Sequence, residues 1–146
     1  MNRGAQAAQA ARAWIGTPYV HQGSAPGAGA DCLGLVRGVW RTLYGTEPEA
    51  APPYTADWGE TGGGEPLMAA ALRNLVAVAP DAPETPGEVL LFRMRDGAVA
   101  KHLGIRTGVG AAASFVHAYD RHGVVESPLS APWRARIVAR FRWPEP

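Results

Sequence analysis

DCLGLVRGVW, residues 31–40, is the stretch around which the rest of the chain can be arranged. Its apolar residues recur with the one-sided spacing of a buried amphipathic helix, at Leu35, Val36, Val39, Trp40 and Leu43. Asp31 stands where an N-cap residue belongs, and Gly45 ends the pattern. Gly34 and Gly38, four residues apart, predict close packing of this helix against other backbone. The sequence therefore predicts a buried helix whose first turn carries the single cysteine, Cys32.

The segment before this helix contains a second helix and a loop. Residues 5–14 are mostly good helix formers, and Gly16-Thr17-Pro18 interrupts them, so the first helix should end near Ile15. Residues 21–30, HQGSAPGAGA, contain three glycines and a proline without a hydrophobic period. We expect a glycine-rich loop there, which leads directly to Asp31 and Cys32.

Beyond the central helix the pattern changes from helical to extended. A long irregular stretch covers residues 46–66, and an Ala-rich helix is expected over Leu67–Val78. Short strands follow it, over Glu88–Arg93, Lys101–Thr107, Ala113–Tyr119, Val124–Ser127 and Arg136–Trp143. This order predicts an α+β fold over residues 1–146 as a single domain, with the N-terminal helices packed on one side of a mostly antiparallel sheet of about five to six strands.

The last of these segments alternates strictly. Ile137, Ala139, Phe141 and Trp143 fall on one side, and Arg136, Val138, Arg140 and Arg142 fall on the other. Such alternation is typical of a half-buried antiparallel strand with a basic outer face.

Composition and charge exclude several classes of protein. The chain has 14 basic and 13 acidic residues, which argues against a nucleic-acid binder that relies on phosphate contacts. One cysteine excludes an internal disulfide framework and a zinc site built on several thiolates of this chain. No apolar run approaches the ~20 residues that span a bilayer. The first 14 residues lack the apolar core of a signal peptide, so we expect synthesis and folding in the cytoplasm.

Cys32 is a candidate nucleophile because of its predicted position. Free backbone N–H groups and the helix dipole at a first helical turn favour a thiolate, which lowers the pKa from its reference of ~8.5. The same N–H groups can serve as an oxyanion hole. The alternative is a buried cysteine that acts as a small apolar side chain.

His102 and His117 are candidates for the base and its orienting partner. His102 lies in the predicted strand KHLGIRT, where Leu103 and Ile105 face one side and His102 and Gly104 the other. His117 lies in the next strand, and neighbouring strands about 4.8 Å apart allow an imidazole–imidazole hydrogen bond. A pair of this kind would fix the tautomer and the ring orientation of the base. Taken singly, each histidine is better explained as a structural residue than as a catalyst.

Five segments in this order resemble the NlpC family of papain-like cell-wall cysteine peptidases. They are WIGTPY (14–19), DCLGLV (31–36), PGEVLLF (86–92), HLGI (102–105) and FVHA (115–118). The resemblance covers nearly the whole chain, and the combination of motifs is specific. The sequences PYVHQG and DCLGLVRGVW resemble those of the family branch that is carried by tailed phages and by phage-derived particles, such as gene transfer agents.

The resemblance implies hydrolysis of amide bonds in peptidoglycan stem peptides, typically between D-glutamate and a diamino acid. By position, Cys32 matches the nucleophile, His102 the general base and acid, and His117 the orienting residue. Tyr19 matches a tyrosine beside the cysteine that helps to hold the oxyanion, or else a ring that fills space behind the loop. Asp31 matches a position that receives the free amine of the peptide, and it is equally explained as an N-cap. No metal and no organic cofactor are implied.

Some positions depart from the family pattern. Leu33 replaces the serine that follows the cysteine in many members, which removes a hydroxyl that helps to bind the amine of the substrate. Leu33 is therefore expected to relax specificity or to shift the bond that is cut. His21 is not expected to be a ligand or a base, Glu88 is expected at a structural turn, and His122 is expected to be solvated.

The resemblance also implies a setting. The chain would be part of a phage tail or a related delivery particle that acts on the cell wall in the periplasm, with tail-tip or baseplate proteins as partners. Candidate contacts are residues 46–66, with Tyr54 and Trp58, and the Arg- and Trp-rich C-terminal strand. Two alternatives stay open: a structural tail component with little turnover, and an amidase or acyltransferase that uses the same cysteine and histidines.

Overall fold

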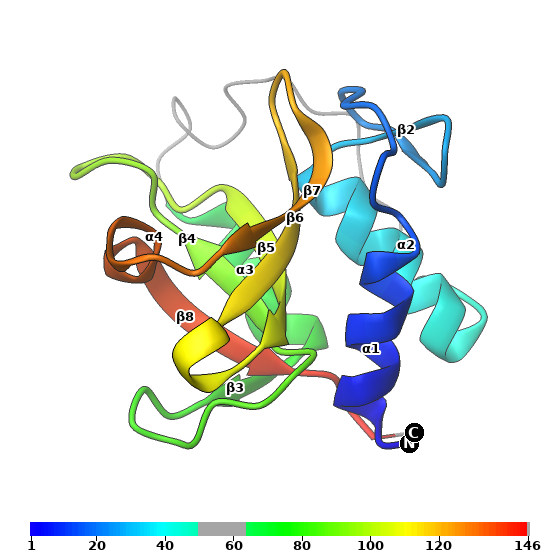
Figure 1. The fold of residues 1–146 in the computed structure, drawn as a ribbon. Helices are drawn as coiled ribbons and strands as arrows, with labels where there is room; N and C mark the ends of the chain where they lie inside the picture. Colours follow the sequence, from blue (N-terminus) through cyan, green and yellow to red (C-terminus); the bar gives the residue numbers. More distant parts are fainter. Residues whose placement is uncertain (50–63, 146) are drawn as a thin grey trace.

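A six-stranded antiparallel sheet organises the protein, as seen in a computed structural model that describes residues 1–49 and 64–145 (Figure 1). In spatial order the strands are β3 (Val76–Val78), β8 (Ile137–Arg142), β4 (Val89–Phe92), β5 (His102–Gly108), β6 (Ser114–Tyr119) and β7 (Gly123–Pro128). Every neighbouring pair is antiparallel. The predicted strand number and direction are confirmed.

Helices lie on both sides of this sheet (Figure 1). On one side pack α1 (Arg3–Arg12) and α2 (Cys32–Tyr44), and α4 (Ala131–Ala135) lies on the other. The remaining elements are the hairpin β1 (Ser24–Ala25) and β2 (Gly29–Ala30), the helix α3 (Pro66–Asn74), and the 3₁₀ turn η1 (Gly110–Ala112). No helix in residues 1–49 and 64–145 is long and apolar enough to cross a membrane.

The α2 helix is built as the sequence predicts. Asp31 Oδ1 accepts a hydrogen bond from the Gly34 amide at 2.7 Å, and Gly45 ends the helix with a φ of 85°. A Cβ on Gly38 would lie 2.0 Å from the Trp14 ring, and one on Gly34 would lie 1.7 Å from a backbone carbonyl oxygen. The two glycines therefore let α2 pack directly against its neighbours.

Alternating residues of the central strands bury both faces of the sheet. Leu103 and Ile105 face α1 and α2, in a cluster that also includes Leu35 and Val39. Phe92 and Phe115 face the opposite side, in a smaller cluster with Leu90 and Leu129. Because both faces are covered, a polar side chain on either face of β5 or β6 is buried and needs a partner.

Several predicted boundaries were wrong. The first helix ends at Arg12, and the expected loop over residues 21–30 contains the β1–β2 hairpin. The helix expected over Leu67–Val78 ends at Asn74, and β3 follows, because Val76–Val78 pairs with β8 and tertiary pairing outweighs local helix propensity there. The short helix α4 was not predicted.

The basic outer face expected for the C-terminal strand is also wrong in part. β8 lies between β3 and β4 and is not an edge strand. Arg140 is buried and paired with Glu88, and Trp143 is buried and donates its indole N–H to the Gly87 carbonyl at 2.7 Å. Part of this segment, with Arg140, Phe141 and Trp143, is therefore core and not a docking edge. The other candidate contact, residues 46–66, lies largely outside the described residues, including Tyr54 and Trp58.

Candidate active site

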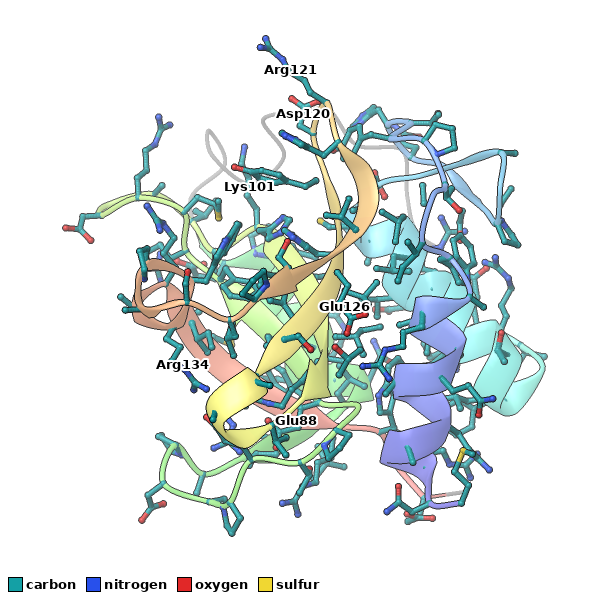
Figure 2. The ribbon with its side chains drawn as sticks, in the orientation of Figure 1. Glu88, Lys101, Asp120, Arg121, Glu126 and Arg134 are labelled. Carbon is teal, nitrogen blue, oxygen red and sulfur yellow. The ribbon has the colours of Figure 1, made fainter. Side chains whose placement is uncertain are left out.

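Cys32 is the first residue of α2 and points at the start of β5. Its thiol lies 3.5 Å from the carbonyl oxygen of Lys101, the residue before His102, and donates to it. Figure 2 shows Lys101 in the upper half of the molecule, below Asp120 and Arg121 at the tip of the β6–β7 hairpin. The structure thus brings the predicted nucleophile to the end of the strand that carries the predicted base.

The two predicted histidines form the expected pair. His102 Nε2 and His117 Nδ1 are 2.8 Å apart, with their rings nearly perpendicular at 81°. His117 is fully buried and His102 is 8% exposed. Since Nε2 of His102 is engaged with His117, only Nδ1 of His102 is left to exchange a proton with the thiol.

Ser127, on β7, extends this pair into a chain and was missed by sequence reasoning. Its hydroxyl lies 2.9 Å from His117 Nε2. For His102 Nδ1 to accept a proton, Nε2 of His102 must carry one and donate it to His117 Nδ1. His117 is then protonated on Nε2 and donates to Ser127 Oγ, so Ser127 helps to select the tautomer of both rings.

Burial keeps the site neutral at rest. It raises the pKa of Cys32 to about 12, and the neighbouring Asp31 carboxylate acts in the same direction. Burial also lowers the pKa of His102 to about 3, with the adjacent His117 as a second cause. For His117 the pKa falls to about 4, again through burial first and then through His122.

The expectation of a lowered thiol pKa is therefore corrected. Backbone N–H groups of Leu103, Leu33 and Cys32 do lower the pKa of Cys32, but burial outweighs them. At neutral pH the resting site holds a thiol and two uncharged imidazoles, so the proton of Cys32 must leave as the sulfur attacks.

Aromatic rings enclose the histidine pair. Trp133 of α4 lies over both rings, with centroids 5.7 Å from His102 and 5.1 Å from His117. Tyr119 stacks on His117 at 5.3 Å. Gly104 leaves room for this packing, because a Cβ there would lie 2.8 Å from the Phe115 ring. The enclosure explains the lowered histidine pKa values. No motif in the sequence pointed to Trp133, because α4 itself was not expected.

Tyr19 and Asp31 lie next to the nucleophile. Tyr19 forms a parallel bridge with Ala30, two residues before Cys32. Burial raises the pKa of Tyr19 to about 12, and the Asp31 carboxylate acts in the same direction, so the Tyr19 hydroxyl stays protonated at neutral pH. Besides capping α2, Asp31 accepts the Gln22 amide on Oδ2 at 2.7 Å. The N-cap prediction is confirmed, and the role of Asp31 toward a substrate amine stays a prediction.

Leu33 is partly buried and packs against the main core cluster. It lines a cavity of about 450 Å³ between α2 and α3, together with Val36, Trp40 and Leu67. The residue after the nucleophile thus offers an apolar surface and no hydrogen bond.

The two other histidines stand outside the site. His21 is partly exposed, with Nδ1 4.0 Å from Asp31 Oδ2, and His122 is exposed in the β6–β7 turn as expected. Among the residues that the structure describes, no cluster of histidine, cysteine or acidic side chains could hold a metal ion.

The neutral resting thiol predicts an unusual alkylation profile. Iodoacetamide reacts with the thiolate, so the rate at Cys32 should rise about tenfold per pH unit through pH 9 without levelling off. Free glutathione, assayed alongside, should level off near a thiol pKa of ~8.5. Quenched alkylation followed by intact-protein mass spectrometry measures both rates. A plateau for Cys32 by pH 8 would show that the thiolate is stabilised at rest.

Comparisons with known proteins agree with this geometry. The sequence profile of the NlpC/P60 family matches residues 16–142. A comparison with curated proteins found no match. Three solved structures share the α+β fold, at identities that support the fold alone.

One of them is the NlpC/p60 domain of the peptidoglycan hydrolase SagA, with a TM-score of 0.59, 23% identity, and coverage of 97% of this chain and 98% of that one. The second is a Staphylococcus aureus Mu50 protein described as similar to a lipoprotein of the NLP/P60 family, with a TM-score of 0.61 and 19% identity over 99% of this chain. The third is an NlpC/P60 family protein from Bacillus cereus ATCC 10987, with a TM-score of 0.62 and 17% identity over 94% of this chain. This chain spans only 42% and 39% of the latter two proteins.

Proposed function

This chain belongs to the NlpC/P60 family, and we propose from that premise that it is a cysteine peptidase that hydrolyses amide bonds in peptidoglycan stem peptides. The observations that carry the proposal are the position of the Cys32 thiol, 3.5 Å from the carbonyl oxygen of the residue before His102, and the 2.8 Å hydrogen bond between the imidazoles of His102 and His117. A solved relative of the same fold is a peptidoglycan hydrolase.

The chemistry follows from the neutral resting state. His102 Nδ1 takes the proton of Cys32 as the sulfur attacks the carbonyl carbon, and His117 stabilises the imidazolium that forms. The oxyanion accepts hydrogen bonds from the Cys32 amide and from the Tyr19 hydroxyl, which stays protonated. His102 then protonates the leaving amine. Water activated by His102 hydrolyses the thioester and restores the thiol.

We further propose that the bond cut joins D-glutamate to the diamino acid. Support comes from the motif resemblance around Cys32 and His102. Leu33 stands where many members have serine, and its apolar surface predicts tolerance toward peptides without a free N-terminal amine.

Digestion of purified peptidoglycan tests both proposals. The wild type should release fragments with new diamino-acid amino termini, identified by mass spectrometry, and the Cys32→Ala protein should release none. Cleavage at the lactyl–alanine bond would make the enzyme an amidase. Release by neither protein would support the structural tail component instead.

We also propose that the protein works in a phage tail or a related delivery particle, made in the cytoplasm and carried to the periplasmic cell wall, with tail-tip or baseplate proteins as partners. The resemblance of the sequences around Tyr19 and Cys32 to the phage-associated branch of the family supports this proposal. Co-sedimentation of the chain with purified particles, and its recovery with detached tails, tests the assignment. Recovery only in the soluble fraction would count against it.

Ser127→Ala should weaken catalysis without weakening substrate binding. Loss of one hydrogen bond of about 1 kcal/mol lets His117 change tautomer and predicts a kcat roughly fivefold lower, with KM unchanged. Ser127→Thr should restore most of the loss because it keeps the hydroxyl. Ser130→Ala is the matched control, because Ser130 is exposed and its side chain does not cap α4. Equal kcat values for Ser127→Ala and Ser130→Ala would remove Ser127 from the proton-transfer chain.

A further inference from the structure

A cluster of charged side chains lies at the opposite end of β5 from the uncharged histidine pair. Arg106 follows His102 by four residues on the same face of the strand, and its side chain is fully buried. Figure 2 shows Glu88 and Arg134, which belong to this cluster, in the lower half of the molecule, and Lys101 at the active-site end in the upper half. The two sites therefore share a strand but not their surroundings.

The guanidinium of Arg106 is only partly satisfied by the protein. Its Nε donates to Glu88 Oε1 at 3.3 Å. Nη1 and Nη2 are both buried, and neither has a hydrogen-bond acceptor among residues 1–49 and 64–145. Nη1 lies 3.5 Å from Glu84 Oε1, which is a charge contact without hydrogen-bond geometry. The hydrogen bond of Glu84 goes instead to Arg134, with 2.7 Å between Oε2 and Nη1.

A cavity of about 350 Å³ is lined in part by Arg106. The charged residues that line it are Glu84, Arg106, Arg134 and Arg140, and its apolar walls come from α3, β3 and β8. Arg140 is held by Glu88, which accepts its Nε and Nη2 at 2.9 Å each. With Glu88 included, three guanidinium groups face two carboxylates, so one positive charge stays unbalanced in this cluster.

We propose that this cavity binds one oxyanion group, a carboxylate or a phosphate, on Nη1 and Nη2 of Arg106, with Arg134 as the second cation. Two parallel N–H groups of a guanidinium match two oxygens of a carboxylate or phosphate. A single negative charge balances the cluster. The oxyanion comes either as a free ion or as the carboxylate end of a peptide. The site is independent of the peptidase chemistry.

The carboxylate of Glu84 competes with an incoming oxyanion for the guanidinium of Arg106. Its carboxylate and the Arg134 guanidinium are each about one third exposed, at 34% and 38%, so both side chains can rotate at the rim of the cavity. An incoming oxyanion replaces the loose contact between Glu84 and Arg106 with two hydrogen bonds. Removal of the charge of Glu84 should therefore tighten oxyanion binding, whereas removal of the charge of Arg134 should weaken it.

Titration of the full chain at constant ionic strength tests the site. Thermal unfolding is followed with increasing phosphate or acetate, with chloride as the reference anion. A saturable rise in Tm is expected with phosphate and acetate. N-acetyl-Ala-Ala should also raise Tm if the site takes the carboxylate end of a peptide, and its C-terminal amide should not. A response to the free ions alone would assign the site to free oxyanions.

Two variants with opposite expected effects decide the proposal. Arg134→Gln should weaken oxyanion binding about tenfold, the loss of one hydrogen bond to a charged group. Glu84→Gln should tighten it about threefold, which corresponds to a partly exposed ion pair. The controls are Arg142→Gln and Glu145→Gln, which make the same charge changes at exposed positions. Absence of saturation in the wild type, or equal responses of variants and controls, would overturn the proposal.

Discussion

Cys32→Ala and His102→Ala are each expected to lower kcat/KM on a stem peptide by about 10³-fold or more, and the double variant is expected to lose no more than either single one. The reason is the neutral resting site. A thiol whose pKa is about 12 is a poor nucleophile until His102 takes its proton, and His102 has no proton to take without the thiol. The two residues thus act as one unit, and removal of either disables both.

The measurement is a double-mutant cycle on a soluble stem peptide, with released amine followed by mass spectrometry. Far-ultraviolet circular dichroism of each variant checks that the fold persists. Arg142→Ala is the control, because Arg142 is exposed on β8 and should leave kcat/KM within about twofold of the wild type. Additive losses in the double variant would mean that Cys32 and His102 act separately.

Glu88→Gln is expected to destabilise the protein by about 3–5 kcal/mol, the cost of breaking a buried ion pair from one side. Glu88 is fully buried, and its carboxylate accepts hydrogen bonds from Arg106, Arg140 and the Thr85 amide. An uncharged glutamine leaves the two buried guanidiniums of Arg106 and Arg140 with only the partly exposed carboxylate of Glu84 to balance them. Urea unfolding followed by tryptophan fluorescence measures the change in free energy of unfolding.

Glu84→Gln provides the comparison within the same cluster. Glu84 is 34% exposed, and its ion pair with Arg134 is worth about 1 kcal/mol or less. The Glu88 variant should therefore lose several times more stability than the Glu84 variant. Similar losses for both would show that the Glu88 network contributes no more than a surface ion pair.

The candidate catalytic residues could be predicted from the sequence because each lies in a strongly patterned element. Helical periodicity placed Cys32 in the first turn of α2, and strand alternation placed His102 and His117 on a shared face. Their 2.8 Å hydrogen bond confirms that expectation. The protonation state of Cys32 was predicted wrongly, since helix position argues for a thiolate and does not show that the thiol is buried and lies beside the Asp31 carboxylate.

Other features depend on strand pairing that local pattern does not reveal. Ser127 reaches His117 only because β6 and β7 pair with Val125 opposite His117, which brings the residue two positions further along the strand within reach. The alternating pattern predicts Arg140 on an exposed face, but β8 lies between two other strands of the sheet and Arg140 is buried and paired with Glu88. The sequence alone predicted β8 but not its position inside the sheet.

Protonation of the Cys32 thiol also governs how the protein withstands oxidants. Peroxides convert a thiolate to sulfenic acid, and a neutral thiol reacts far more slowly. Cys32 has no second cysteine in the chain to trap a sulfenic acid as a disulfide, so an early oxidation would progress toward irreversible sulfinic acid. With its thiol protonated at rest, Cys32 is expected to react slowly with peroxides, and under the proposed mechanism the sulfur becomes a nucleophile only when a carbonyl carbon is in place.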